Sequence, residues 1–237
     1  MSNAKTDAPK HARVVHHGDG IAFLNDARAS GGGVIAGVSI ITSLPDISEL
    51  PKLGDDGWAE WFVDAARLCC ASVADDALAI FFQSDVKHAS TGWIDKGALV
   101  SRAAREAGLT TVFHRIVLRA PAGTVTHGRA AYSHLIGFSK KARLDLAKPG
   151  CDVLPSAGET TWTRGMGVHA CRAACEAVLA WTPTRTVLDP FCGHGTVLAV
   201  ANDMGLDAIG VELGGKRAKK ARALTLEDLV SDEASKT

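Results

Sequence analysis

The stretch that most constrains the fold is residues 186–213, TVLDPFCGHGTVLAVANDMGLDAIGVEL. It predicts a strand, a glycine turn, a helix ended by Gly205 and a second strand that ends at Glu212. Parallel strands joined by a crossover helix build an α/β sheet that is covered on both faces. Units of this kind usually open a domain, yet this one begins at residue 186 of 237. The other strands of the sheet must therefore come from earlier residues.

The upstream residues alternate between strand and helix patterns. Strands are predicted within residues 12–17, 38–41, 76–85, 109–121 and 130–140. Helices are predicted within residues 20–26, 55–74, 95–108 and 161–182, and a basic helix within 214–230 closes the chain. This order predicts an α/β, doubly wound, mainly parallel sheet with an antiparallel late strand. We expect a single domain over residues 13–228, with disordered tails at 1–12 and 229–237.

Composition excludes some classes of protein. Lys+Arg and Asp+Glu both number 26, so bulk charge does not hold the chain on nucleic acid, although a local basic patch can. No apolar run is as long as a membrane span, so no membrane partner is expected. The six cysteines do not resemble a disulfide framework, which predicts reduced thiols and a cytoplasmic protein. Cys171 and Cys175 lie close to His169, but small buried cysteines on a helix are common, and no metal is predicted.

The glycine turn has the features of a cofactor half-site. Gly193 and Gly195 let the backbone approach a ligand closely, and the helix that follows offers free N–H groups to an anion. Glu212 follows Asp189 by 23 residues at the tip of the next strand, where an acid accepts both hydroxyls of a ribose. Only G-x-G is present, which favours a cofactor with one carboxylate and one ribose, such as S-adenosylmethionine (SAM), over a dinucleotide. The alternatives are a dinucleotide oxidoreductase and a glycine turn without a cofactor.

The segment LDPFCGHGT resembles the SAM-binding motif of the amino-methyltransferases, which include DNA adenine-N6 and cytosine-N4 enzymes and related RNA enzymes. In one permuted branch of that family the catalytic half comes first, which would explain the late cofactor unit. HHGDGIAFL, VSIITSLPD and GMGVHACRAACEAVLAWTPTRTVLD resemble other segments of that branch, so the resemblance runs from about residue 14 to 222. It implies a Rossmann-like methyltransferase sheet and SAM as the cofactor. The cofactor-binding residues that it implies are Asp19, Gly165, Met166, Asp189, Phe191, Cys192, Gly193, Gly195, Thr196 and Glu212.

The catalytic loop implied by the resemblance is Ser43-Leu44-Pro45-Asp46. In the family the first side chain and a proline carbonyl hold the target amine, and an aromatic residue stacks on the base. This chain has Asp46 in place of the aromatic residue, and it lacks the family's Lys-Pro at Val168-His169. Asp46 can accept a hydrogen bond from the amine or act as a general base. It can equally cap the helix or turn that begins at Ile47.

Five residues are predicted to bind the substrate. Asp85 ends a strand at the edge where ligands bind, and Trp93 can stack on a base or anchor its loop. Arg115, Arg119 and Arg129 flank the connection between the two late strands and can contact phosphates. Tyr132 and His134 are predicted to pack in the core, and Cys192 is predicted to be a small loop residue.

The predicted activity is SAM-dependent methyl transfer to a nucleic-acid base. Residues 140–162 are too few for a separate recognition domain, which favours a structured RNA such as tRNA or rRNA, with DNA second. A small molecule or a protein is the third substrate class. The alternative of a different kind is a non-catalytic or partner-dependent SAM-binding subunit, and a homodimer is left open.

Overall fold

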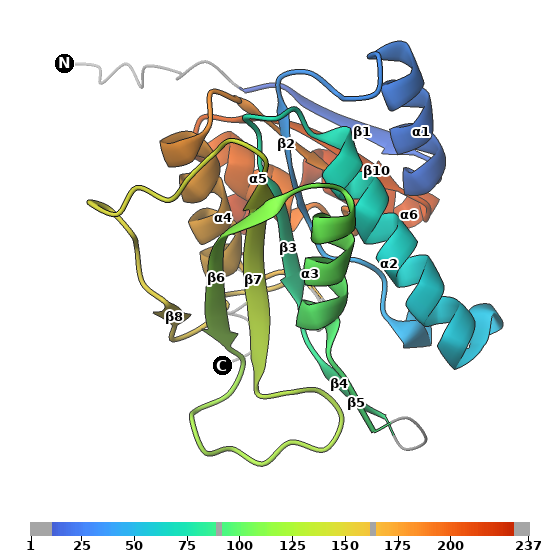
Figure 1. Ribbon diagram of the computed structural model, residues 1–237, viewed down its shortest axis with the longest axis vertical. Helices are drawn as coiled ribbons and strands as arrows, with labels where there is room; N and C mark the ends of the chain where they lie inside the picture. The colour runs from blue at the N-terminus through green and yellow to red at the C-terminus, as the bar shows by residue number, and fades with distance from the viewer. Residues whose placement is uncertain (1–10, 89–91, 162–164, 230–237) are drawn as a thin grey trace.

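The computed structural model describes residues 11–88, 92–161 and 165–229. Within these ranges the main feature is an eight-stranded sheet in the order β1-β10-β9-β2-β3-β7-β6-β8 (Figure 1). β7 is antiparallel to both of its neighbours, and every other pair is parallel. The predicted mainly parallel sheet with an antiparallel late strand is thus confirmed. The strands are β1 (Arg13–His17), β2 (Val38–Thr42), β3 (Ala79–Gln83), β6 (Thr110–Leu118), β7 (Tyr132–Ser139), β8 (Val153–Leu154), β9 (Thr186–Asp189) and β10 (Asp207–Glu212).

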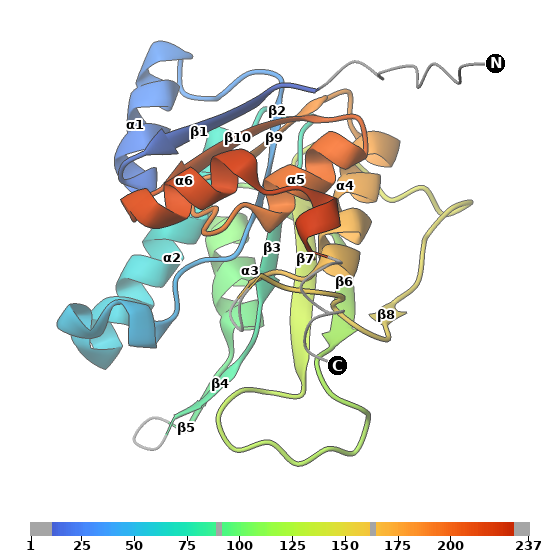
Figure 2. The same ribbon diagram turned by 180° about the vertical axis from the view of Figure 1, so that it is seen from behind.

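Six α-helices of the described ranges cover the two faces of the sheet. One face carries the first three helices, which share a core with Leu24, Phe62 and Val100 (Figure 1). The other face carries the last three, whose core includes Cys171 and Leu198 (Figure 2). The helices are α1 (Gly20–Ser30), α2 (Gly54–Ser72), α3 (Lys96–Glu106), α4 (Val168–Trp181), α5 (Thr196–Asp203) and α6 (Gly215–Ala223). The doubly wound arrangement follows from strands such as β2 and β3, in which every residue is buried.

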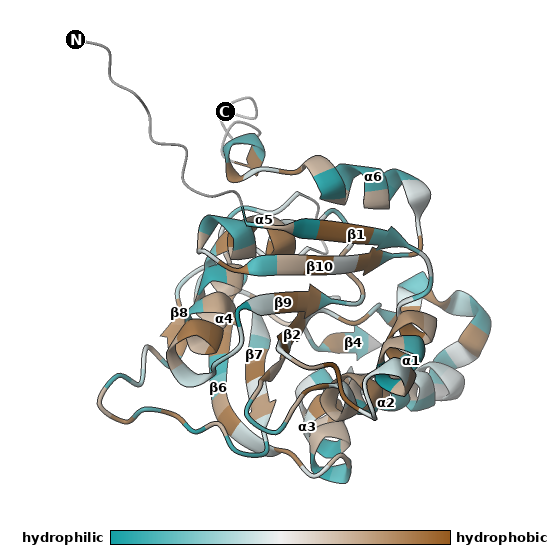
Figure 3. Ribbon diagram, turned by 90° about the horizontal axis from the view of Figure 1, so that it is seen from above, coloured by the Kyte–Doolittle hydropathy of each residue, from teal (hydrophilic) through white to brown (hydrophobic). Residues whose placement is uncertain are grey.

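Pairing between distant parts of the chain explains the late cofactor unit. β9 lies beside β2, and β10 lies beside β1, so the last strands complete the sheet begun by the first residues. Figure 3 shows β1, β10 and β9 side by side, with α6 packed along them and hydrophilic residues on its outer surface. The two halves of the sequence therefore meet between β2 and β9, and the carboxyl ends of both strands face the same edge.

Three features are absent from the sequence-based prediction: a hairpin after β3, β8 and the 3-10 helix η2 (Pro51–Leu53). The β4 (Val86–His88) and β5 (Gly92–Ile94) strands form this separate hairpin. The 3-10 helix η1 (Ile47–Glu49) begins where a helix or turn was expected, and both 3-10 helices precede α2. The hairpin and the β6–β7 connection project from the same end of the molecule (Figure 1). Lys87 joins them, because its backbone N–H donates to the Gly128 carbonyl and its Nζ donates to the Thr126 carbonyl.

The predicted tails fall mostly outside the described residues, as do 162–164 of the predicted loop before α4. Residues 11, 12 and 229 are described, and the Ala12 N–H donates to Asp207 Oδ1 at 2.8 Å. Among the helices of the described residues, none is long and apolar enough to cross a membrane.

Candidate active site

A cavity of about 640 Å³ opens at the carboxyl edge of the sheet, where the loops after β2, β3, β9 and β10 converge. In open α/β sheets ligands bind outside the carboxyl ends of the strands, which is the edge where this cavity lies. The structure brings together most of the residues predicted from sequence. The lining includes Asp19, Ser43, Leu44, Pro45, Asp46, Arg119, Arg129, Gly165, Met166, Asp189, Phe191, Cys192, Gly193, Thr196 and Glu212.

The glycine turn has the conformation that the sequence requires. Gly193 and Gly195 have φ values of 54° and 89°, which side chains with a Cβ disfavour. A Cβ at Gly193 would meet no described atom within 4 Å, so this backbone stays open to the cavity. A Cβ on Gly195 would lie 2.8 Å from Ala221 Cα. Gly195 does not line the cavity and allows α6 to pack against the start of α5, and its predicted cofactor contact stays a prediction.

Glu212 lies at the tip of β10 and connects the two turns of the half-site. Its Oε2 accepts the Gly193 N–H at 3.1 Å, while its Oε1 accepts the Gly214 N–H at 2.6 Å. Arg217 also donates to Oε1, from its Nε at 2.7 Å. The carboxylate is fixed at the cavity wall, and its Oε2 keeps acceptor capacity for a hydroxyl group.

Asp19 and Asp189 line the same part of the cavity but differ in environment. Asp19 is the N-cap of α1, where it accepts the Ala22 N–H at 2.9 Å. Asp189 is buried beneath the turn and accepts hydrogen bonds from Thr42 Oγ1 and the Phe191 N–H, at 2.7 and 3.1 Å. Burial outweighs these two donors and raises the pKa of Asp189 to about 7.

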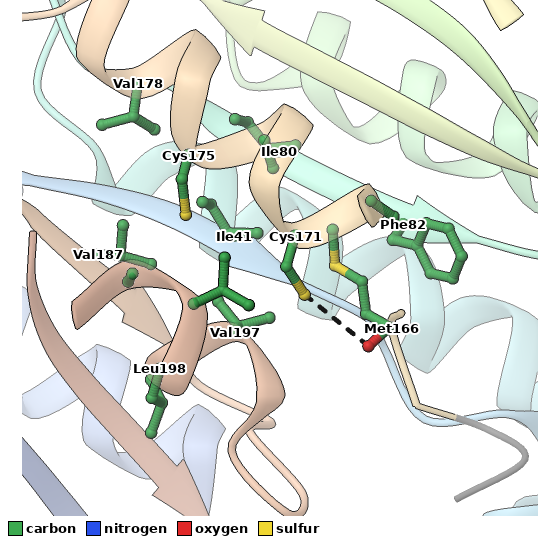
Figure 4. Close-up of a cluster of buried hydrophobic side chains, with 14 of the residues drawn as sticks. Ile41, Ile80, Phe82, Met166, Cys171, Cys175, Val178, Val187, Val197 and Leu198 are labelled. Carbon is green, nitrogen blue, oxygen red and sulfur yellow. Dashed lines mark hydrogen bonds between the residues drawn. The ribbon is translucent and has the colours of Figure 1, made fainter. Parts of the chain in front are cut away.

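The start of α4 closes the cavity with apolar atoms. Met166 lies beside Phe82, and the Cys171 thiol points toward the Met166 carbonyl at 3.8 Å (Figure 4). Cys171 and Cys175 both project into the apolar cluster between α4, α5 and the sheet (Figure 4). Burial raises the pKa of both thiols, so neither offers a thiolate. All six cysteines are free in the described chain.

The predicted catalytic loop follows β2 directly. Ser43, Leu44 and Pro45 line the cavity, and Leu44 also belongs to the buried cluster that includes residues of α2. The Pro45 carbonyl accepts a hydrogen bond from Trp58 Nε1 at 3.3 Å. A carbonyl oxygen has two lone pairs, so Pro45 keeps one for a substrate amine.

Asp46 has partners on both carboxylate oxygens. It caps η1 through the Ile47 N–H at 2.8 Å, and the Glu49 side chain accepts the Asp46 N–H in return. Lys96 Nζ lies 3.4 Å from Oδ1, and Arg129 donates to Oδ2 at 2.5 Å. Burial alone would raise the pKa of Asp46, but Lys96 and Arg129 outweigh it and the pKa lies below its usual value. An acid held in this way is a weak general base, so the arrangement favours capping and charge pairing over proton abstraction.

Asp85 and Trp93 lie beside the cavity and do not line it. Asp85 is buried and accepts hydrogen bonds from the Lys96 N–H at 2.9 Å, Trp93 Nε1 at 3.2 Å and His134 Nε2 at 3.0 Å. It joins the β4–β5 hairpin to α3 and β7. These donors occupy the carboxylate and give it a structural role, and its predicted contact with substrate stays a prediction. Trp93 is held by Asp85 but stays 49% exposed, with Lys87 Nζ 5.6 Å from its ring.

The three predicted arginines have different positions. Arg115 is buried against the rings of Phe113 and Trp181 and donates to the Pro149 carbonyl at 3.1 Å. It does not line either cavity, and its predicted contact with substrate stays a prediction. Its side chain alternates along β6 onto the face covered by α4.

Arg119 and Arg129 lie at the two ends of the β6–β7 connection and line the cavity. A second cavity, of about 620 Å³, is also lined by both arginines and by Asp46. It extends past η1 and the base of the β4–β5 hairpin. Burial and the nearby Arg129 lower the pKa of Arg119, but the Arg119 side chain stays positively charged at neutral pH.

Lys96 and Gln83 are buried polar residues of the cavity that the sequence analysis did not assign to the site. Lys96 is 3% exposed, its Nζ lies 5.8 Å from the Trp58 ring, and burial lowers its pKa. Gln83 ends β3 and is 2% exposed. Gln83 stands two residues before Asp85, and the only available signal was the position of these side chains at the end of a strand or at the start of a helix. Tyr132 and His134 pack beside Asp85, in accord with a structural role.

One group within the described residues has metal-ligand spacing: single ligand atoms of Asp85, Asp95 and His134 lie within 4.8 Å of one another. The hydrogen bonds of Asp85 described above account for this cluster, and Asp95 caps α3 through the Ala98 N–H. Its arrangement is that of a structural hydrogen-bond network.

A family model described as a DNA methylase, of the N6 and N4 type, matches residues 178–222. These residues run from the end of α4 through the glycine turn to α6. A sequence comparison with curated proteins gives no significant match.

Several solved structures share the fold. A Thermus thermophilus protein proposed to be a DNA modification methylase, in complex with SAM, has a TM-score of 0.65 at 16% identity, over 92% of this chain and 95% of that one. The PvuII DNA methyltransferase, cytosine-N4-specific, has a TM-score of 0.63 at 15% identity, over 94% of this chain and 93% of that one. The M1.HpyAVI protein with SAM has a TM-score of 0.55 at 14% identity, over 89% of this chain and 97% of that one.

Proposed function

We propose that the chain is a SAM-dependent methyltransferase of nucleic-acid bases. It carries a segment that matches the N6/N4 DNA methylase model, and its fold is similar to that of such enzymes. The single observation that carries this proposal is one cavity that joins the glycine turn to the loop Ser43–Asp46. Cofactor and acceptor groups come from opposite ends of the sequence, and they face each other only because β9 lies beside β2.

The residues at the glycine turn fit SAM. Glu212 presents a fixed acceptor for ribose hydroxyls, and Gly193 leaves its backbone open to the cavity. Asp19 and Asp189 line the cavity as hydrogen-bond acceptors, and Met166 and Phe82 provide apolar contact. When bound, SAM supplies a methyl group on a sulfonium, which transfers to a nucleophile by in-line displacement as the sulfur keeps the bonding pair.

The chain aligns the acceptor and excludes water from the methyl group. Ser43 Oγ and the free lone pair of the Pro45 carbonyl can accept the two hydrogens of an exocyclic amine. This leaves the nitrogen lone pair to attack, and the amine afterwards loses one proton to solvent. Asp46 holds Lys96 and Arg129 in place beside the loop.

Two observations support a nucleic acid as the substrate. Arg119 and Arg129 stand where the two cavities meet, so phosphates that flank an unstacked base can contact them. The neighbouring residues 86–88, 92–94 and 119–131 contain no acid, in a chain with equal numbers of acids and bases. We favour DNA as the substrate over the RNA that the sequence favoured, because the similar solved structures are described as DNA methylases.

Transfer of labelled methyl from SAM tests the proposal. DNA, total RNA and a metabolite pool from cells that lack this gene should be offered separately. We expect label in DNA, and nucleoside analysis then identifies the methylated atom. Label in RNA alone would identify RNA as the substrate, as the sequence favoured. Label in metabolites alone would overturn the proposal of a nucleic-acid substrate. SAM binding without label in any pool would indicate a partner-dependent or non-catalytic subunit. Ser43→Ala is the matched variant, expected to bind SAM and transfer more slowly.

A further inference from the structure

The single glutamine of the chain, Gln83, lies at the wall of the active-site cavity. It ends β3, is 2% exposed, and its Nε2 has no hydrogen-bond partner among the described residues. A buried amide without a partner costs free energy that a methyl or methylene group would not. Its presence here therefore needs a reason, and the cavity that it lines is the place to look.

Gln83 faces the substrate end of the cavity rather than the glycine turn. Phe82, the residue before it, belongs to the core under α4, whereas Phe81 belongs to the core under α2 and α3. Side chains alternate along a strand, so Gln83 points to the side of Phe81. Lys96 at the start of α3 and the Leu44 side chain lie on that same side and also line the cavity.

We infer that Gln83 recognises the target base: its side-chain amide pairs with the exocyclic amine that is methylated and with the ring nitrogen beside that amine. This inference rests on the proposed function. The Nε2 group donates to the ring nitrogen, and the Oε1 atom shares one of the two amine hydrogens with Ser43 Oγ or the Pro45 carbonyl. A half-turn of the amide exchanges the two atoms, so either order along the cavity wall is available.

The chemistry of the amide fits this role. Glutamine offers one donor and one acceptor side by side, which is the complement of an amine next to a ring nitrogen. Adenine presents that pair, and glutamine reads it in protein–DNA interfaces. Cytosine presents the same pair through its N4 amine and N3. Thymine and uracil carry a carbonyl and an N–H at the corresponding atoms, so they leave the amide mismatched.

Neighbouring polar side chains are already paired and do not compete for this role. The Ser84 hydroxyl pairs with Ser133 Oγ at 2.5 Å, and Lys96 pairs with Asp46. Asp85 is occupied by its three donors. Gln83 thus combines burial, a position on the cavity and an unused hydrogen-bonding group.

The test combines Gln83→Met with a deaza substrate. Methionine keeps a similar length and removes both polar atoms. An oligonucleotide that carries the mapped target site is compared with one whose target base lacks the ring nitrogen beside the amine. In the parent protein the deaza base should lower kcat/KM about 10–100-fold. Gln83→Met should show a loss of the same order on the normal base, with SAM affinity unchanged, and little further loss on the deaza base. Ser84→Ala is the matched control and should keep the full deaza penalty.

Each result bears on the inference. A Gln83→Met protein that transfers at the parental rate, or that keeps the whole deaza penalty, would overturn it while the proposed function stands. If the parent transfers methyl to no nucleic acid, the proposed function fails. The inference is then judged by equilibrium binding of single-stranded oligoadenylate and oligocytidylate, normal and deaza. A parent that fails to distinguish the normal from the deaza strands would overturn it there as well.

Discussion

Asp46→Asn should unfold the protein more easily without removing a helix cap. Asparagine caps helix N-termini about as well as aspartate, so the change removes mainly the charge opposite Lys96 and Arg129. The side chains of Asp46 and Lys96 are 7% and 4% exposed, which makes this a buried pair. Loss of one partner from such a pair leaves an uncompensated charge and costs about 3–5 kcal/mol.

Urea titration at pH 7 is the assay, with the change in unfolding free energy taken from the midpoint and slope. The double variant Asp46→Asn, Lys96→Met should recover part of the loss, because the buried cation has been removed and the methionine still covers the Trp58 ring. Asp46→Ala should cost about 1 kcal/mol more than Asp46→Asn, because it also removes the cap.

The reasoning would be refuted by an Asp46→Asn protein that keeps the parental stability and loses methyl transfer. That result would make Asp46 a catalytic base in spite of its two cations. Transfer should be measured well below the unfolding midpoint of the variant, so that loss of folded protein does not imitate loss of chemistry.

Four further predictions concern the cofactor half-site. Gly195→Ala should destabilise by at least about 1–2 kcal/mol in urea titration, since its φ is 89° and its Cβ would lie 2.8 Å from Ala221 Cα. Gly193→Ala, whose Cβ would meet no described atom within 4 Å, should cost less stability and mainly weaken SAM binding in calorimetry. Glu212→Gln should raise the Kd for SAM about 10–100-fold, as loss of a charged acceptor predicts; an unchanged Kd would place the ribose elsewhere. Asp189 has a folded pKa of about 7, above its unfolded value, so its contribution to stability is fully present below about pH 4 and lost as the pH rises to about 7. The pH profile of unfolding for Asp189→Asn should be flatter in that window.

The local elements were predictable because each depends on short-range patterns. The unbroken apolar runs of β2 and β3, and the glycine turn between β9 and α5, follow from residues that are neighbours in sequence. The β4–β5 hairpin was missed because its strands are only three residues long and its stability comes from contacts with Asp85 and the β6–β7 connection.

Side-chain roles were predictable only where the backbone fixes them. Gly193 and Glu212 are set by the turn and by the end of a strand, and both line the cavity as expected. Arg115 was assigned to substrate because it stands near the connection between the two late strands, and Asp85 because it stands at a strand end. Their actual partners, Trp181 and His134, are 66 and 49 residues away in the sequence. No pattern in a single sequence reports such pairings.

The sequence by itself determined a doubly wound α/β sheet with a cofactor turn at its late end, because apolar periodicity and glycine conformation act within a few residues. Only the tertiary structure decided which groups pair with Asp46 in the loop after β2. Asp46 loses its freedom to act as a base when α3 brings Lys96 and the β6–β7 connection brings Arg129. Gln83 becomes notable only when packing buries it beside the cavity without a partner among the described residues. Charge pairing and desolvation depend on distance in space, and the fold sets that distance.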